Sequence, residues 1–208
     1  MSARRVAVFI DYENMSRCAS SSFGGSGHFW PWKLGERLVE IRNASGANPE
    51  SVLHQVRVYR GLPDARRQRG ANAANQAQTA AWVKACPDVD HLRVFRRPLR
   101  YPKKWPNGSE RPQEKGVDVA LAVDLVQISY QGGFDVGIVC SHDSDLAPAL
   151  DVAASVRTTG VHLEVASWAK QKRISFSDNS NKPWCHRLSG ADFAQVQDQT
   201  NYVPNGTT

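Results

Sequence analysis

Short apolar runs alternate along the chain with longer segments whose apolar residues recur at helical spacing. The short runs lie at 5–11, 52–59, 91–95, 135–140 and 161–165, and the longer segments lie at 32–43, 72–86, 117–130 and 146–156. This alternation of strands and helices is typical of a parallel sheet that is covered by helices on both faces. The sequence therefore predicts an α/β fold, a three-layer α/β/α sandwich around a central, mainly parallel five-stranded sheet.

Two segments interrupt this pattern as loop insertions. Residues 19–32 begin with a run rich in Ser and Gly and end with three aromatic residues, which predicts a flexible loop. Residues 96–115 form a second loop with four prolines, and a loop of this length is usually functional or disordered. Residues 184–188 have the composition of a short strand. We expect one domain over 1–190, followed by a C-terminal tail over 191–208.

The apolar runs are too short for a membrane-spanning helix, which needs about 20 residues. The first run is interrupted at Asp11, so it lacks the length of a secretory signal, and a cytoplasmic location is expected. The four cysteines include no Cys-x-x-Cys pair and are expected to be reduced thiols.

Charge is unevenly distributed along the chain. Residues 57–115 contain 14 basic and 5 acidic residues, whereas residues 116–151 contain six Asp and no Lys or Arg. The basic stretch favours an anionic partner. The aspartates of the second stretch lie among apolar segments, where unpaired carboxylates are costly to bury, and this favours a bound cation.

Acidic and amide side chains follow two of the predicted strands. Asp11 ends the first strand, with Asn14 three residues later, and Asp143 and Asp145 follow the fourth strand. Because ligands of such sheets bind outside the carboxyl ends of the strands, we expect these side chains at one rim. Asp118 begins the next helix on its inward face and is expected to reach the same rim. Asp118 and Asp143 could instead serve only as helix caps.

Carboxylates that are held together repel one another unless a divalent cation neutralises them. Mg²⁺ or Mn²⁺ suits oxygen ligands of this kind. Such a cation lowers the pKa of a bound water and offsets negative charge on a phosphate. The pattern therefore favours hydrolysis of phosphodiester bonds by a metal-activated water.

Three motifs follow one another along the chain. They are Val8-Phe-Ile-Asp11-Tyr-Glu-Asn14, Glu114-Lys-Gly-Val-Asp118, which an apolar run extends to Asp124, and Cys140-Ser-His-Asp143-Ser-Asp145-Leu. Together they resemble the NYN domain family of PIN-like nucleases, which includes the bacterial LabA-like group, over about 6–165. The resemblance implies a PIN-like sandwich and an Mg²⁺- or Mn²⁺-dependent ribonuclease. It also implies Asp11, Asp118 and Asp143 as catalytic metal ligands, supported by Asn14 and Asp145.

The chain departs from the family pattern in the third motif. His142 stands where the family has glycine, and Leu146 stands where it has phenylalanine. If the glycine is needed for a positive φ, histidine would impair the site. His142 could otherwise contact a phosphate or be a tolerated variant of the turn.

The loop over 96–115 combines cations with aromatic rings, the two features that bind the phosphates and unstacked bases of single-stranded RNA. Because the loop leads into the helix of Asp118, RNA bound there would be delivered to the acids. A solvated linker is the alternative. The candidate RNA-binding residues are Arg96, Arg97, Arg100, Tyr101, Lys103, Lys104, Trp105 and Lys115.

The sequence as a whole favours a ribonuclease that acts on single-stranded or structured RNA. Two other functions stay open: an RNA-binding or regulatory module with a weak or inactive nuclease centre, and a structure-specific DNA nuclease. A homodimer or a partner protein is also open. The chain has no Gly-x-x-x-x-Gly-Lys-Ser/Thr loop, and its Gly-rich run at 24–27 does not join a predicted strand to a helix, which disfavours nucleotide-dependent enzymes of those classes.

Overall fold

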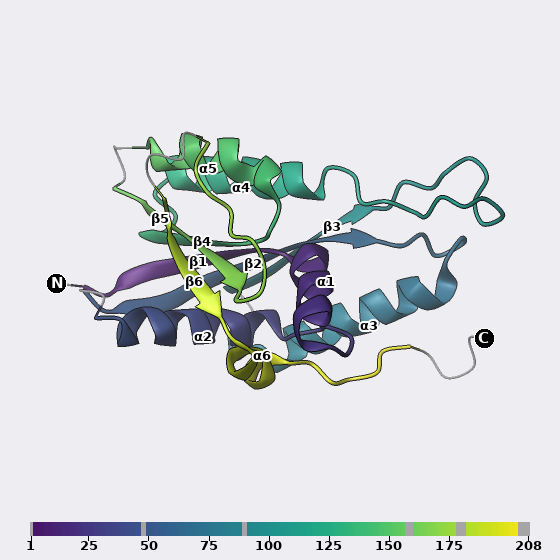
Figure 1. Ribbon diagram of the computed structural model, residues 1–208, viewed down its shortest axis with the longest axis horizontal. Helices are drawn as coiled ribbons and strands as arrows, with labels where there is room; N and C mark the ends of the chain where they lie inside the picture. Colours follow the sequence, from purple (N-terminus) through teal and green to yellow (C-terminus); the bar gives the residue numbers. More distant parts are fainter. Residues whose placement is uncertain (1, 47–48, 89–90, 157–159, 178–181, 204–208) are drawn as a thin grey trace.

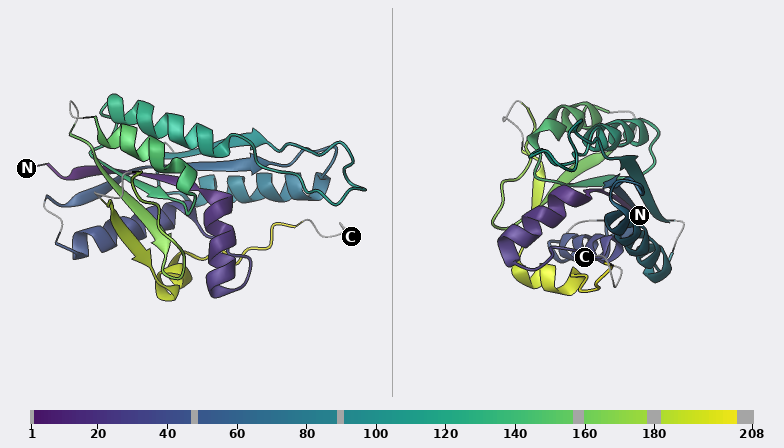
Figure 2. Two further views of the ribbon diagram at one scale, coloured as in Figure 1. Left: turned by 45° about the horizontal axis from the view of Figure 1, so that its top comes forward. Right: turned by 90° about the vertical axis from the view of Figure 1, so that its right-hand side faces the viewer.

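The computed structural model describes residues 2–46, 49–88, 91–156, 160–177 and 182–203. Within these residues six strands form one sheet in the order β3-β2-β1-β4-β5-β6, and all neighbouring strands are parallel. Figure 1 shows α4 and α5 on one face of the sheet and α2 and α3 on the other, and the views in Figure 2 agree. The predicted α/β/α sandwich is confirmed.

The elements follow one another in the order that the alternating pattern predicts. Their bounds are β1 (Arg4–Asp11), α1 (Tyr12–Phe23), α2 (Pro31–Ala44), β2 (Ser51–Leu62), α3 (Arg69–Ala85), β3 (Leu92–Pro98), α4 (Val117–Tyr130), β4 (Val136–Cys140), the short 3₁₀ helix η2 (Ser144–Leu146), α5 (Ala147–Ala154), β5 (His162–Trp168), β6 (Trp184–Leu188) and α6 (Gly190–Val196).

The side chains of β1 alternate between two halves of the core. Val6 and Val8 pack in one buried cluster with residues of α1, α2, α3 and α6, whereas Ala7 and Phe9 pack in another with residues of α4 and α5. Successive side chains of a strand point to opposite faces of the sheet. Asp11 therefore continues the set that faces α4 and α5.

Two parts of the structure differ from the sequence-based expectation. The sheet has six strands rather than five, because β6 pairs with β5 along its whole length. Residues 19–32 are not a flexible loop: α1 continues to Phe23, α2 begins at Pro31, and Phe29 between them is fully buried. The small side chains of α1 pack closely against the core, and this burial outweighs the low helix propensity of serine.

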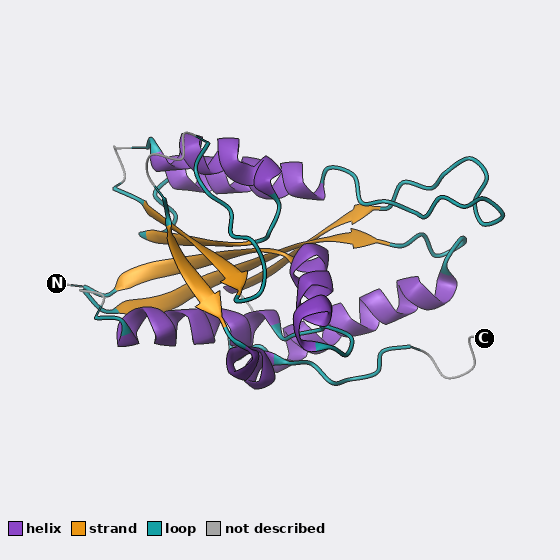
Figure 3. Cartoon of the chain, in the orientation of Figure 1, coloured by secondary structure: helices purple, strands orange, loops and turns teal. Residues whose placement is uncertain are grey.

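Residues 99–114 form a loop, here called the arm, that projects from the domain and whose two ends are paired. Arg100 and Gln113 pair in an antiparallel bridge with N···O distances of 2.9 and 3.0 Å. Figures 1 and 3 show this arm extending beyond the sheet at the end where β2 and β3 terminate. The predicted tail over 191–208 begins inside α6, and Gln197 then bridges to Phe29. Its last residues, 204–208, lie outside the described residues.

None of the described helices is long and apolar enough to cross a lipid bilayer.

A buried ion network ties α2 to three strands. Glu164 of β5 is 3% exposed, accepts a hydrogen bond from Arg42 Nε of α2 (3.0 Å) and lies 2.6 Å from His186 Nε2 of β6. Arg42 also donates to Ser51 Oγ at the start of β2 (2.6 Å). Burial opposes ionisation of Glu164, but the hydrogen bonds from His162 and His186, with the nearby charges, outweigh it and hold the pKa of this carboxyl well below its usual range.

We expect the replacement Glu164→Gln to lower the free energy of unfolding by about 3 kcal/mol at pH 7, because Arg42 then stays buried without a countercharge. Because folding lowers the pKa of Glu164, its contribution is complete above the ordinary value of 4.5 and is lost as the pH falls below it. Urea unfolding is therefore expected to show a smaller difference between the two proteins at pH 4.

The matched control is His162→Gln, which removes a half-exposed partner of the same carboxylate. We expect it to change the free energy of unfolding by less than about 1 kcal/mol. Equal losses in the two variants would contradict a role for the buried Arg42–Glu164 pair.

Candidate active site

The order of the strands reverses between β1 and β4. The chain builds outward from β1 to β2 and β3, and then returns to place β4 on the other side of β1. Ligands of parallel sheets bind at such a reversal, outside the carboxyl ends of the strands. Asp11 is the last residue of β1, and Asp143 lies three residues beyond the end of β4. Both acids therefore lie at the rim where a ligand site is expected.

Asp11 is a buried carboxylate with few groups to stabilise its charge. Its side chain is on a residue that is 6% exposed, and Ser141 Oγ donates a hydrogen bond to its Oδ2 (2.9 Å). Burial raises the pKa of Asp11 to about 6; the Ser141 hydrogen bond opposes this rise, and the charge of Asp143 adds to it. A carboxyl group perturbed in this way at a strand end is a candidate functional group.

Asp143 caps the short helix η2, which is one of the two roles that the sequence allowed for it. Its Oδ1 accepts a hydrogen bond from the Asp145 N–H (3.0 Å). Its own N–H donates to Ser141 Oγ (3.1 Å), so the same hydroxyl contacts both acids of the rim. The side chain of Asp145 is exposed and makes no hydrogen bond to a described residue.

Asn14 and His142 fasten the loop that carries Asp143. Asn14 Oδ1 of α1 accepts a hydrogen bond from the His142 N–H (2.9 Å). Burial lowers the pKa of His142, so its ring is neutral at pH 7, and its Nδ1 lies 2.8 Å from the Lys172 carbonyl oxygen. Because a carbonyl only accepts, this contact requires a proton on Nδ1. His142 thus helps to hold the loop in position through its N–H and its ring, a role that the sequence did not indicate.

Asp118 is a candidate metal ligand that no described contact joins to Asp11 or Asp143. It lies in the first turn of α4, is partly exposed, and its side chain makes no hydrogen bond or ion pair with another described residue. Within the described ranges, no three Asp, Glu, His or Cys side chains are grouped closely enough to hold a cation together. Asp124, further along α4, is ion-paired: its Oδ2 lies 2.6 Å from Arg57 Nη2.

Glu114 is an acid of the site that sequence reasoning missed. Burial raises its pKa to about 7, and the negative charges of Glu13 and Asp11 add to this rise. Its carboxylate accepts a hydrogen bond from the Gly61 N–H and lies 4.0 Å from the Arg17 guanidinium. Glu13 and Glu114 both stand inside the motifs quoted above, so their position beside Asp11 and before Asp118 was the available signal.

A cleft of about 990 Å³ adjoins the rim, lined by Glu13, Arg17, Arg60 and Glu114 among others. Arg60 is 5% exposed; its Nη2 lies 2.9 Å from Glu13 Oε1, and its guanidinium lies over the ring of Tyr12. Residues 199–203 form another wall. Asp11 and Asp143 are not part of this lining, so the cleft lies beside the two acids, and the charge of Arg17 in its lining acts on Asp11.

Tyr101 anchors the arm to the turn before α3. Its hydroxyl accepts from the Asp64 N–H and donates to Gln68 Oε1, both at 2.8 Å. The Arg67 guanidinium lies 5.0 Å from the centre of its ring, and Trp105 packs edge-on against it. Tyr101 is thus engaged within the protein. The basic residues among the candidates for RNA binding are all exposed: Arg96, Arg97, Arg100, Lys103, Lys104 and Lys115.

The donors at the rim suit Mg²⁺ or Mn²⁺. Such ions prefer carboxylate oxygens and commonly keep several waters when one or two carboxylates hold them. Asp11 is a buried carboxylate whose charge is disfavoured by burial and by Asp143, and a cation would remove both penalties. The carboxylates of Asp11 and Asp143 therefore fit the chemistry of such a cation.

Comparison with known proteins points to one family. The model of the NYN domain matches residues 5–181. The crystal structure of a protein of unknown function from Vibrio parahaemolyticus RIMD 2210633 is similar, with a TM-score of 0.52 and 14% sequence identity, over 82% of this chain and 85% of that chain. At this identity the likeness shows a shared fold. No curated protein matches the chain significantly.

We expect Asp11→Asn to raise the free energy of unfolding by about 1–3 kcal/mol at pH 8 in EDTA. Folding raises the pKa of Asp11 from 3.8 to about 6, so its charge is a penalty that is absent below pH 3.8 and complete above pH 6. The amide avoids this penalty, and urea unfolding is expected to show the gain at pH 8 and little of it at pH 4.

Asp135→Asn is the matched control, because Asp135 directly precedes β4 at the opposite end of that strand. Its hydrogen bonds with Arg5 hold its pKa below the usual range, so this variant is expected to lose stability at pH 8. If Asp11→Asn also lost stability at pH 8, this would contradict the description of Asp11 as a carboxylate whose charge is disfavoured by burial.

Proposed function

Because the chain belongs to the NYN domain family of PIN-like nucleases, we propose that it is a ribonuclease that depends on Mg²⁺ or Mn²⁺ and hydrolyses phosphodiester bonds of single-stranded or structured RNA. The observation that carries the proposal is the buried carboxylate of Asp11 beside Asp143 at the reversal of the sheet. A buried anion favours a cation, and a cation beside a basic arm favours a polyanionic substrate.

Asp11 and Asp143 would hold the cation, with Asp118 as the candidate third acid and Asp145 and Asn14 in support. When bound, Mg²⁺ or Mn²⁺ supplies Lewis-acid activation of a water and neutralises charge on the scissile phosphate.

The rest of the rim keeps the two carboxylates in place before substrate arrives. Ser141 Oγ contacts both Asp11 and the backbone of Asp143. Asn14 and His142 hold the loop after β4 against α1 and against the segment after β5. Groups fixed in advance stabilise a transition state without the cost of reorganisation during the reaction.

Cations in the cleft and on the arm suit the phosphates of an RNA strand. Arg17 and Arg60 line the cleft, and each faces a glutamate with which a phosphate would compete. Lys103 and Lys104 on the arm, and Lys115 before α4, are exposed and extend this positive track. The arrangement favours a strand that runs along the rim from the cleft toward the arm.

One observation favours a second function, an RNA-binding module with an inactive nuclease centre. Among the described residues Asp118 does not join Asp11 and Asp143 in a group of three acids. In that case the same basic track would bind RNA, and the cleavage assay below would show no metal-dependent products.

The proposal predicts cleavage of labelled single-stranded and stem-loop RNA in Mg²⁺ or Mn²⁺ and none in EDTA. Asp11→Asn and Asp143→Asn are each expected to lower the cleavage rate by about 100-fold or more, because each removes a charge that stabilises the transition state. Thermal unfolding gives a readout besides activity: Mn²⁺ is expected to raise the melting temperature of the wild type and to have little effect on Asp11→Asn.

Asp135→Asn is again the control and is expected to cleave at the wild-type rate. Tight RNA binding without cleavage in either metal would overturn the nuclease and leave the RNA-binding module. Equal cleavage by Asp143→Asn and the wild type would overturn the assignment of the site.

For the arm, we expect the double variant Lys103→Ala with Lys104→Ala to bind RNA more weakly and with less dependence on salt. Each phosphate contact to a single strand contributes about 0.7 to the slope of log affinity against log salt, so the slope is expected to fall by about 1.4. Fluorescence anisotropy in EDTA measures both quantities. Lys33→Ala, on exposed α2 surface, is the control, and an unchanged slope in the double variant would exclude the arm from RNA binding.

A further inference from the structure

β2 and β3 carry the same four-residue pattern side by side. Arg57-Val-Tyr-Arg60 in β2 pairs in register with Arg93-Val-Phe-Arg96 in β3, which places Tyr59 next to Phe95. Their rings are stacked, with centres 4.9 Å apart and planes 10° from parallel. Because side chains alternate along a strand, both rings face α4, whereas Arg60 and Arg96 face the other side of the sheet.

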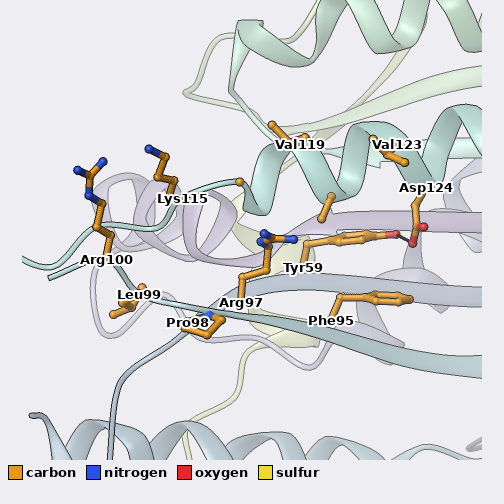
Figure 4. Close-up of a pocket in the computed structure, with 12 residues that line it drawn as sticks. Tyr59, Phe95, Arg97, Pro98, Leu99, Arg100, Lys115, Val119, Val123 and Asp124 are labelled. Atoms are coloured by element: carbon orange, nitrogen blue, oxygen red, sulfur yellow. Dashed lines mark hydrogen bonds between the residues drawn. The ribbon is translucent and has the colours of Figure 1, made fainter.

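A pocket of about 860 Å³ opens over this aromatic pair, between the sheet and α4. Val119 and Val123 of α4 form its apolar wall and are 58% and 56% exposed, and Phe95 on the edge strand is partly exposed. Figure 4 shows the two rings lying parallel below these valines. Valine and aromatic surface thus stays exposed to water in one hollow.

The mouth of the pocket is basic. Arg97, Arg100 and Lys115 line it, and all three are exposed. The acid in the lining, Asp124, is neutralised, since its Oδ2 lies 2.6 Å from Arg57 Nη2 and accepts a hydrogen bond from the Tyr59 hydroxyl at the same distance. The pocket therefore combines an apolar aromatic floor with exposed positive charge at its entrance.

This combination suits a nucleotide better than a second copy of the chain. Nucleobases stack on aromatic rings irrespective of sequence, and their phosphates bind nearby cations. β3 is an edge strand that carries Arg93, Arg96 and Arg97, and two such edges brought together would repel each other. The charge of the edge is complementary to a polyanion.

The pocket also adjoins the candidate active site. Leu99 lines both this pocket and the cleft, and Lys115 at the pocket follows Glu114 at the cleft. The segment around Leu99 thus separates two neighbouring hollows. A single strand crossing Leu99 would place one nucleotide in the pocket while another lies at the rim.

We propose that this pocket is a base-binding subsite, in which a nucleobase of single-stranded RNA stacks on the exposed surface of Phe95, which Tyr59 supports from within, while adjacent phosphates bind Arg97 and Lys115. The inference rests on the proposed function in taking RNA as the ligand, and it goes beyond it by assigning a place for a nucleotide outside the cleavage position.

The test measures binding of a short labelled oligouridine by anisotropy in EDTA, where cleavage plays no part. Phe95→Leu is expected to weaken binding about tenfold, because it removes the stacking surface. Val123→Glu is expected to weaken it by at least as much, since it places a negative charge in the pocket at an exposed position of α4. An oligomer of the same length made of abasic residues is expected to bind both Phe95→Leu and the wild type equally.

Trp184→Leu is the matched control, because Trp184 is an exposed aromatic residue on β6, the opposite edge of the sheet. It is expected to bind oligouridine as the wild type does. Uridine monophosphate, with a single phosphate, is expected to compete only weakly.

Wild-type affinity in both Phe95→Leu and Val123→Glu would overturn the subsite while leaving the nuclease untouched. A wild-type dimer that Val123→Glu dissociates would assign this face to a second copy, and a monophosphate that binds more tightly than the oligomer would assign it to a free nucleotide. Stacking-dependent binding by a protein that cleaves nothing would support the subsite and reject the nuclease.

Discussion

All neighbouring strands of the sheet are parallel, and the position of every candidate functional group follows from this constraint. Parallel strands end at one edge, so residues that are distant in sequence meet there. Asp11 is the last residue of β1, and Asp143 comes shortly after the end of β4. Arg60 and Arg97 lie near the ends of β2 and β3. The reversal of strand order between β1 and β4 then sends the connections on either side of the two acids in opposite directions.

Two buried carboxylates, one in the core and one at this rim, differ in how far their charge is compensated by neighbouring groups. Glu164 is compensated by Arg42 and His186, which outweigh the cost of burial and lower its pKa. Asp11 is offered chiefly the hydroxyl of Ser141, so burial dominates and raises its pKa. The chain supplies partners where a carboxylate only holds elements together. Where it withholds them, the buried charge lowers stability, a cost that is common at functional sites.

The sequence predicted the layers of the fold and the place of Asp11 and Asp143, because apolar periodicity and strand ends are local features. It did not predict that α1 continues to Phe23, since the serines there are weak helix formers and only tertiary packing makes their small size an advantage. Glu114 was missed for a related reason: its proximity to Asp11 and Gly61 joins three segments far apart in the chain. The sequence indicated a basic loop at the arm. It did not indicate the bridge between Arg100 and Gln113, because composition does not specify which residues pair.

The repeated Arg-Val-aromatic-Arg pattern of β2 and β3 joins these observations. A pattern with a period of two sends its aromatic residues to one face and its last arginine to the other, so one short sequence serves both sides of the sheet. On one face Arg60 is buried between Tyr12 and Trp82 and holds Glu13 at the cleft. On the other, the Tyr59–Phe95 pair is left beside exposed valines, because α4 packs over the middle of the sheet and not over its edge. Register, rather than any single residue, thus makes the edge of this sheet both cationic and aromatic.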